Sequence, residues 1–212
     1  MQDDAEFFSL LAVDAVVAER VASPSFETPA SGDHRIDRAT TELTGATSAV
    51  VFTDGGCDPN PGTGGWGVVI ESADSAPVEL WGGVKDTTNN RMELTAAIVA
   101  LTVLPTACAI TIKSDSQYLI KGMTIWLAGW KRKLYRRKDG LIPNHDLWRT
   151  LNTLSIGRQI EWEWVRGHSG AVGNERADGL AARGITEARS QGVRYRAMLA
   201  AAPGASQQDS TP

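Results

Sequence analysis

Hydrophobic and polar positions follow two periodicities in the central part of the chain. Short apolar or β-branched runs, typical of strands, occur at 49–53, 65–71, 78–84, 109–113 and 159–165. Apolar residues at helical spacing predict helices at 91–104, 147–154 and 174–183, and one or two helices at 117–129. The first three strands have short connections, which favours an antiparallel meander. The order βββαβααβα predicts a fold of mixed α and β elements (α/β, with the mixed sheet of an α+β protein).

The two ends of the chain differ from this middle part. Apolar residues at roughly helical spacing predict a short amphipathic helix over 5–20, and the Ser-, Pro- and Gly-rich stretch at 21–48 is typical of a linker. The polar residues of 186–212 predict a disordered tail. All 7 tryptophans lie in 49–185. Because large aromatic side chains dominate core burial, we expect 49–185 to be the folded domain.

Net charge changes this picture little. The value of −4 for 212 residues at first argues against a nucleic-acid partner. However, residues 1–48 carry nine acids and three bases, 49–185 carry fourteen acids and fifteen bases, and 186–212 carry two acids and three bases. The expected domain is therefore close to neutral, and the acidic balance belongs to the N-terminal extension.

The cysteines and the N-terminus favour a reducing compartment. Cys57 and Cys108 are too few for a disulfide framework or a four-cysteine zinc site, so we expect two reduced thiols, with Cys108 buried. The first residues are acidic where a signal peptide would be basic, and Ser9 and Asp14 interrupt the apolar stretch at 7–18. We expect no membrane contact and a cytoplasmic location.

Four acids occupy the ends of predicted elements. Asp54 ends the first strand, Asp115 ends the fourth, Glu93 lies in the first turn of the helix at 91–104, and Asp178 lies in the last helix. If the first and fourth strands are neighbours, Asp54 and Asp115 lie side by side, and packed helices can add the other two. Clustered carboxylates need cations to stay ionised, and oxygen ligands select Mg²⁺ or Mn²⁺. Two such ions, held close together, can stabilise the attacking and leaving oxygens of a phosphoryl transfer.

Each acid taken alone has a simpler structural explanation. Asp54 can begin a turn, Asn90 and Glu93 can form a capping box, Asp115 can cap the next helix, and Asp178 can be a solvated helix acid. The metal hypothesis depends on all four acids occurring together in this topology.

Five motifs carry a resemblance to a known family. They are TDGGCDPNPG at 53–62, TTNNRMEL at 87–94, SDSQY at 114–118, GHSG at 167–170 and NERAD at 174–178. Their order and spacing resemble type 1 ribonuclease H over about 49–185. The resemblance implies a ribonuclease H-like fold, with a five-stranded mixed sheet flanked by helices and a basic protrusion. It also implies an endoribonuclease that cuts the RNA strand of RNA–DNA hybrids and leaves 5′-phosphate and 3′-hydroxyl ends.

The resemblance assigns the reaction to particular residues. Two Mg²⁺ ions, which Mn²⁺ can replace, would be held by Asp54, Glu93, Asp115 and Asp178, with Asp54 bridging both. His168 would shuttle a proton and help the product leave. We expect the chain to act as a monomer.

The same resemblance implies contacts to both strands. The RNA 2′-hydroxyl is read in the minor groove, and side-chain amides suit it because they donate and accept. The implied RNA-strand residues are Cys57, Asn60, Asn89, Asn90 and Gln117. The implied DNA-strand residues are Thr88, Trp126 and Asn144, together with six bases within 131–138: Lys131, Arg132, Lys133, Arg136, Arg137 and Lys138.

Two features depart from the family pattern. Many relatives carry an arginine where this chain has Asp86, and an acid there would repel a DNA phosphate unless Lys85 compensates or Asp86 points away. Residues 1–48 lack the aromatic and basic content of the hybrid-binding domain found in eukaryotic relatives. A helix for a protein partner and a dispensable tail both remain open for this extension.

Two other functions fit the sequence less well. A non-catalytic hybrid-binding module usually lacks one of the acids, whereas all four are present here. The minor-groove amides and the basic segment argue against a related nuclease or an integrase-type strand transferase.

Overall fold

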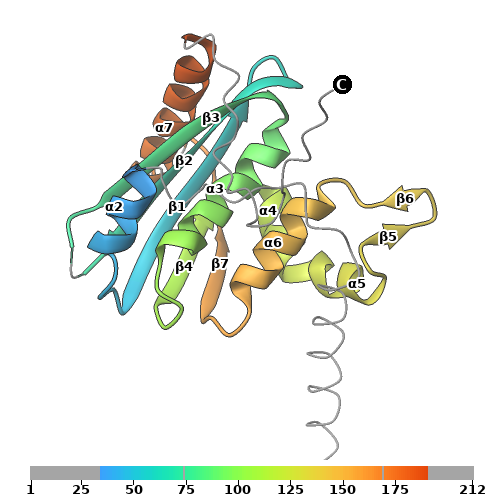
Figure 1. The fold of residues 1–212 in the computed structure, drawn as a ribbon, viewed down its shortest axis with the longest axis horizontal. Coiled ribbons are helices and arrows are strands. Elements are labelled where there is room, and N and C mark those ends of the chain that lie inside the picture. Colours follow the sequence, from blue (N-terminus) through green and yellow to red (C-terminus); the bar gives the residue numbers. More distant parts are fainter. Residues whose placement is uncertain (1–33, 74, 169, 191–212) are drawn as a thin grey trace, which may run out of the picture.

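A five-stranded mixed sheet forms the centre of the molecule. The computed structural model describes residues 34–73, 75–168 and 170–190, and its main sheet has the order β3-β2-β1-β4-β7 (Figure 1). The first three strands form an antiparallel meander, while β4 and β7 add in parallel. The predicted fold class is therefore confirmed. The strands are β1 (Ser48–Cys57), β2 (Gly62–Ser72), β3 (Val78–Thr87), β4 (Ala109–Ser114) and β7 (Ile160–Trp164).

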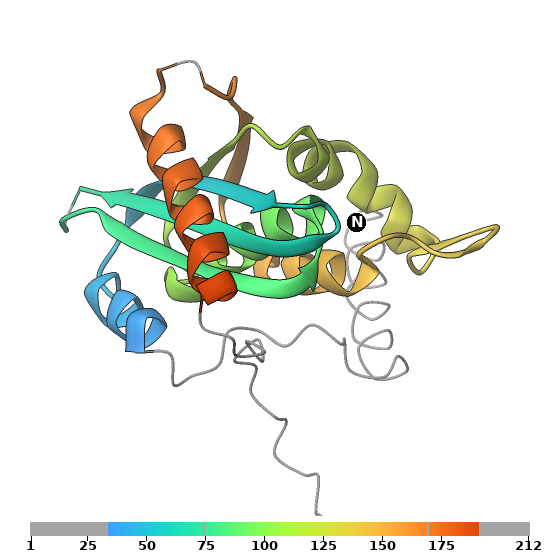
Figure 2. The same ribbon diagram turned by 90° about the horizontal axis from the view of Figure 1, so that it is seen from above.

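Helices cover both faces of this sheet. α3 (Asn89–Val103) packs on β1 and β2 and contacts α6 (His145–Ser155), while α7 (Val172–Ser190) crosses β2 and β3 on the opposite face (Figure 2). α4 (Gln117–Lys121) continues through the π-helical turn η1 (Gly122–Trp126) into α5 (Leu127–Arg132). The helices predicted at 91–104, 117–129, 147–154 and 174–183 are confirmed, and α7 is longer than expected.

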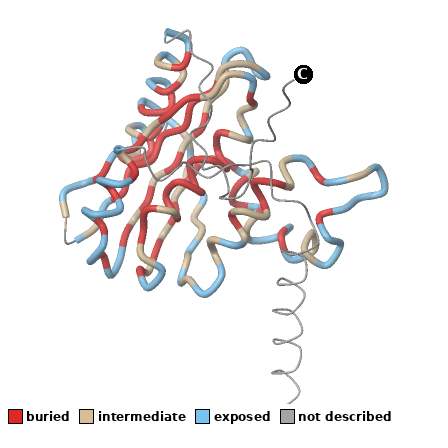
Figure 3. The backbone as a smooth tube through the Cα atoms, viewed as in Figure 1, coloured by how far each residue is buried: buried red, intermediate tan, exposed pale blue. Residues whose placement is uncertain are grey.

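The core lies between the sheet and α3. α3 is buried from Met92 to Leu101, because it is enclosed by the sheet on one side and by α6 on the other (Figure 3). A helix that is apolar around most of its circumference is suited to such an enclosed position. The position of α3 therefore fixes where Glu93, which it carries, can point.

Small residues bring α7 close to the opposite face. A Cβ atom added at Gly65 would overlap the carbonyl oxygen of Ala181, and one added at Gly67 would overlap that of Ala177. The backbone of α7 is thus in direct contact with β2. This contact fixes the height of α7 above the sheet and, with it, the place of Asp178.

The first strand is longer than the sequence predicts. It continues through Asp54 to Cys57, because pairing with β2 persists from Asp54 opposite Gly67 to Cys57 opposite Gly64. Asp54 therefore lies inside a strand rather than at its end. Neither the strand end nor the turn that the sequence suggested for Asp54 is correct.

The predicted linker is wrong over its second part. α2 (His34–Glu42) begins there, and its residues Ile36 and Ala39, together with Leu43 just beyond it, are buried in the core. Likewise α7 continues through Ser190, so the first residues of the predicted tail are helical. The helix expected over 5–20 and the rest of the tail lie outside the described residues.

None of the helices in the described part of the chain has both the length and the hydropathy that a membrane span requires.

Candidate active site

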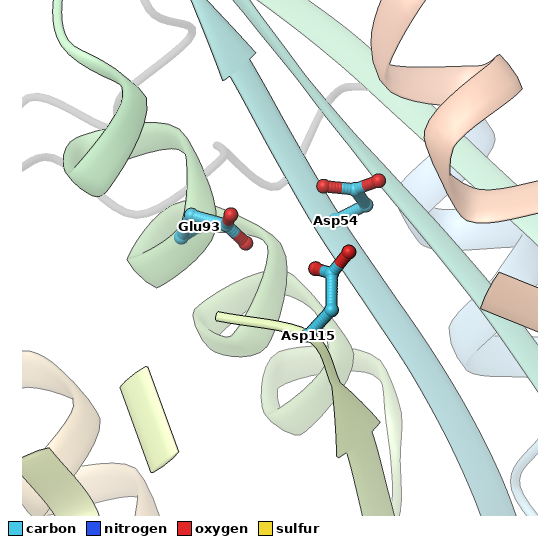
Figure 4. A group of neighbouring side chains, drawn as sticks. All are labelled: Asp54, Glu93 and Asp115. Atoms are coloured by element: carbon cyan, nitrogen blue, oxygen red, sulfur yellow. The ribbon is translucent and has the colours of Figure 1, made fainter. Parts of the chain in front are cut away.

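Three carboxylates converge at one point beside the central strands. One carboxylate oxygen from each of Asp54, Glu93 and Asp115 lies within 4.8 Å of the corresponding oxygens of the other two residues. Figure 4 shows the three groups facing a common space. β1 and β4 are parallel neighbours with Phe52 opposite Lys113, so Asp54 and Asp115, each two residues further on, lie side by side. The expectation that neighbouring strands bring these two acids together is confirmed.

Two glycines allow the third carboxylate and a loop to approach. A Cβ atom at Gly55 would overlap the backbone of Glu93, so α3 can contact β1 only because this position has no side chain. A Cβ atom at Gly167 would overlap the carboxylate of Asp115, which brings the β7–α7 loop against the site. The amide N–H of Gly55 also donates to Asp54 Oδ1 at 2.6 Å.

Helix capping does not explain Glu93 or Asp115. The N-cap of α3 is Thr88, whose Oγ1 accepts from Arg91 N at 3.4 Å, and Glu93 lies beyond the first turn of the helix rather than in it. The N-cap of α4 is Ser116, whose Oγ accepts from Leu119 N at 3.3 Å. The capping alternatives that the sequence left open for these two acids are therefore wrong.

Glu93 is the most constrained member of the group. The residue is 5% exposed, and its Oε2 atom is buried without a hydrogen-bond partner among the described residues. A buried carboxylate oxygen without a partner is costly unless a cation or a proton accompanies it.

The surroundings raise the pKa of two of these carboxyl groups. Burial, and then the charge of Asp115, raise the pKa of Asp54 to about 7. Burial, followed by the charges of Asp54 and Asp115, raises the pKa of Glu93 well above its usual range. A divalent cation would reverse both effects, because it favours the ionised forms. Clustered oxygen donors and the unpartnered Glu93 oxygen thus fit a hard divalent ion.

Asp178 and His168 lie at the rim of this group. Both side chains are exposed, and Asp178 is not among the three clustered carboxylates. Nevertheless, the charge of Asp178 raises the pKa of Asp54 and that of His168 lowers it, so both lie within electrostatic reach. His168 has a left-handed backbone, with φ of 50°.

Comparison with known proteins identifies the family that carries this geometry. The sequence model of the RNase H family matches residues 46–186. Ribonuclease HI of Pseudomonas aeruginosa is 48% identical over 146 residues, which cover 68% of this chain and 98% of that protein. The chain belongs to the ribonuclease H family. It is therefore an endoribonuclease of a family that depends on divalent metal ions.

Other relatives agree with this assignment. Ribonuclease H of Methylorubrum extorquens is 51% identical over 146 residues, which cover 69% of this chain and 64% of that longer protein. The crystal structure of LC9-RNase H1, a type 1 RNase H with the type 2 active-site motif, matches with a TM-score of 0.60 and 28% identity. That match covers 73% of this chain and 86% of the other. The resemblance to type 1 ribonuclease H is confirmed.

The residues expected to read the RNA strand lie on or next to the elements that carry the carboxylates of this ribonuclease H. Asn89 N donates to Asn60 Oδ1 at 3.2 Å, which joins the β1–β2 loop to the start of α3. Cys57 Sγ donates to the carbonyl oxygen of Thr87 at 3.4 Å, and burial raises the pKa of this thiol. Asn90 and Gln117 are exposed at the starts of α3 and α4.

The two residues expected to hold a DNA phosphate meet through Arg91. Its backbone N–H donates to Thr88, and its Nη1 donates to Asn144 Oδ1 at 3.4 Å. The guanidinium also forms a salt bridge with Asp146. Sequence reasoning did not select Arg91 or Asp146 as functional, although Arg91 lies within the TTNNRMEL motif.

Asp86, the departure from the family pattern, is exposed at the end of β3. Its backbone is left-handed, with φ of 60°. It thus places an acid on the surface two residues before the Thr88 cap.

The basic segment forms a separate projection, which we call the protrusion (residues 131–141). It contains the end of α5 and a short hairpin, β5 (Arg136–Arg137) and β6 (Gly140–Leu141), which the sequence did not predict (Figure 1). Its exposed bases are Arg132, Lys133, Arg136, Arg137 and Lys138, while Lys131 is partly buried.

An aromatic cluster anchors the protrusion to the domain. Trp126, at the end of η1, is 36% exposed, and its ring centroid lies 5.6 Å from that of Trp130. Trp130 in turn lies 5.1 Å from the fully buried Trp148. Trp126 is therefore partly exposed where the base of the protrusion packs on the domain.

Proposed function

We propose that this ribonuclease H cleaves the RNA strand of RNA–DNA hybrids in an active site formed by Asp54, Glu93, Asp115 and Asp178. These residues would hold two divalent cations, Mg²⁺ or Mn²⁺, and the products would carry 5′-phosphate and 3′-hydroxyl ends. The convergence of Asp54, Glu93 and Asp115, with an unpartnered buried oxygen on Glu93, is the observation that carries the proposal. LC11-RNase H1, solved in complex with an RNA/DNA hybrid, has a similar fold, with a TM-score of 0.52 and 24% identity.

Asp54 has the central place in the proposed mechanism. It lies beside Glu93 and Asp115 and within the electrostatic reach of Asp178, so it would help to hold both cations. When bound, such ions would activate the attacking water and stabilise the leaving 3′ oxygen. The protein would contribute closely spaced oxygen ligands, because β1, β4 and α3 bring these three side chains together.

His168 would carry protons at the rim of the site. Its imidazole is exposed on the loop that Gly167 brings against Asp115. An exposed imidazole in that place can exchange protons between the reacting groups and solvent. Its removal would slow turnover without preventing cation binding.

The two strands of the hybrid would be recognised separately. Cys57, Asn60, Asn89, Asn90 and Gln117 would contact the RNA strand next to the carboxylates. On the DNA strand, Thr88 and Asn144 would hold one phosphate, Trp126 would pack on a deoxyribose, and the bases of the protrusion would follow the backbone. The spacing between these two sets would favour a duplex over a single strand.

We also infer that the working unit is residues 34–190 of a single chain. Asp54, Glu93 and Asp115 converge within one copy of the chain, and α2 belongs to the same core as the sheet.

A labelled hybrid tests this function. The full chain should cut its RNA strand only when Mg²⁺ or Mn²⁺ is present, and should spare single-stranded RNA and duplex DNA. Asp54→Asn should abolish cutting, while Arg183→Lys, at an exposed residue of α7 whose guanidinium lies over the Trp81 ring, should not. Full activity of Asp54→Asn, or activity in the presence of a chelator, would refute the metal assignment.

A further inference from the structure

An ion pair joins the beginning of α3 to the beginning of α6. Arg91 Nη1 lies 3.1 Å from Asp146 Oδ1, and Arg91 Nη2 lies 2.8 Å from Asp146 Oδ2. Such paired, parallel hydrogen bonds fix the orientation of both groups. Burial alone would raise the pKa of Asp146, but the hydrogen bonds and charge of Arg91 outweigh it and lower that pKa. Asp146 is 5% exposed, so the carboxylate is shielded from water, while the Arg91 side chain is 32% exposed.

The same arginine contacts both residues of the proposed DNA-phosphate site. Its backbone N–H donates to Thr88 Oγ1, and its Nη1 donates to Asn144 Oδ1, both at 3.4 Å. Thr88 caps α3, whereas Asn144 precedes α6, so the two come from different elements. Arg91 therefore links them directly.

The chemistry of arginine decides how Asn144 is turned. A guanidinium can only donate hydrogen bonds, so the amide must present its oxygen to Arg91 and its nitrogen to the other side. There, Asn144 Nδ2 donates to Tyr118 Oη at 3.2 Å. The Tyr118 hydroxyl oxygen also accepts from Trp148 Nε1, at 3.0 Å. An amide nitrogen has two hydrogens, so one remains to donate to a ligand.

The backbone around Asn144 agrees with a fixed orientation. Its φ is 57°, in the left-handed region that few residues other than glycine adopt. Thr88 is oriented in a similar way: because its Oγ1 accepts from Arg91 N, its own O–H can donate elsewhere. Both groups are thus arranged as donors, and a phosphate oxygen is a pure acceptor.

We propose that Arg91, held by Asp146, is the positioning residue that orients Asn144, beside the α3 cap Thr88, as a donor to one phosphate of the DNA strand. This inference rests on the proposed function, which places a DNA phosphate at these two residues. Asp146 balances the charge of Arg91, so the site depends on oriented hydrogen bonds more than on net charge. That arrangement suits a chain in which Asp86 occupies the place of the arginine found in many relatives.

Arg91→Lys is the direct test, because an ammonium keeps the charge but loses the planar fork that engages Asp146 and Asn144 together. With the full chain, a labelled hybrid and saturating Mg²⁺, KM should rise about tenfold, the effect of losing one well-placed hydrogen bond to a charged group. The kcat should stay within about twofold, because the carboxylates are untouched. Asp146→Asn, which keeps the size of the side chain, should raise KM similarly.

Coupling separates positioning from a general loss of structure. Asn144→Ala should also raise KM, and adding Arg91→Lys to it should change KM little further, because the arginine then has no amide to orient. Arg158→Lys is the matched control: Arg158 Nη1 donates to the carbonyl oxygen of Leu104 at 3.0 Å, at the far end of α3. It should leave KM unchanged.

Each contrary outcome has its own meaning. An unchanged KM in Arg91→Lys, or additive effects with Asn144→Ala, would overturn the positioning role while leaving the phosphate site in place. A fall in kcat at constant KM would overturn it too, since Arg91 would then support Glu93. If Thr88→Ala and Asn144→Ala leave KM unchanged, the phosphate site fails and the positioning role with it, although cleavage at the carboxylates would still stand.

Discussion

Gly55 of β1 lies directly against the backbone nitrogen of Glu93 in α3, where no Cβ atom could fit. This contact places the start of α3 on the central strand and carries the Glu93 carboxylate to Asp54. A single missing side chain thus makes the three-carboxylate group possible.

Gly55→Ala should therefore damage both stability and activity. The added methyl group would push α3 away from β1, at a cost of about 1–3 kcal/mol in the free energy of unfolding. Because Glu93 would move with the helix, Mg²⁺-dependent cleavage should fall by a larger factor than stability alone explains. Urea unfolding and hybrid cleavage measure the two effects. Gly129→Ala in α5, where no atom lies within 4 Å of the added Cβ, is the control that should lower neither.

Stability should depend on pH and Mg²⁺ together. In the folded protein without metal, the pKa of Asp54 is raised to about 7, above the value of about 3.9 expected in an unfolded chain. The folded state then binds more protons, so the contribution of Asp54 to stability falls as pH rises from about 4 to 7. Mg²⁺ should offset this loss by favouring the ionised form.

Melting curves in chelator and in Mg²⁺ at pH 5 and pH 8 test this linkage. The gain in melting temperature from Mg²⁺ should be larger at pH 8 than at pH 5. In Asp54→Asn the difference between the two pH values should shrink. An equal gain at both pH values in the unaltered protein would contradict the predicted coupling.

The protrusion should contribute affinity that depends on salt. Replacing Arg136 and Arg137 with alanine removes two exposed charges from the β5–β6 hairpin. KM should rise uniformly across hybrid sequences, and the slope of log affinity against log salt should decrease by roughly one to two. Arg91→Lys should leave that slope almost unchanged, because its charge is kept. If the hairpin variant keeps the original slope, the protrusion does not follow a phosphate backbone.

α2 should stabilise the domain although it precedes the family match. Ile36 and Leu43 are buried against the core, and the Arg35 guanidinium lies 4.9 Å from the ring centroid of Trp81. A chain beginning at residue 47 should lose about 3 kcal/mol or more of stability, since burying each large aliphatic side chain contributes about 1.5–3 kcal/mol. A chain beginning at residue 34 is the control and should have the same melting temperature as the full chain. Equal melting of both truncated forms would show that α2 is dispensable.

Much of this architecture follows from local patterns in the sequence. β1 and β4 have the alternating burial of strands, and parallel pairing of β1 with β4 is enough to bring Asp54 next to Asp115. The proximity of Asp54 and Asp115 is therefore predictable from the sequence once these two strands are taken as neighbours.

The missed features depend on contacts that no local pattern records. α2 has only a short apolar stripe among charged and threonine residues, so its burial depends on the core that it meets. The extension of β1 to Cys57 depends on pairing with glycines of β2, residues that locally suggest a turn. Arg91 and Asp146 are far apart in the sequence, and only the packing of α3 against α6 brings them together.

The most direct test of the metal site is the behaviour of Glu93→Gln with and without Mg²⁺. The amide keeps the shape of Glu93 but removes the charge that is buried without a partner. Without metal the variant should be at least as stable as the unaltered protein at pH 8, while its Mg²⁺-dependent cleavage of a hybrid should fall by roughly 10²-fold or more. A Glu93→Gln variant that cleaves the hybrid at an unchanged rate would contradict the assignment of this buried carboxylate as a cation ligand.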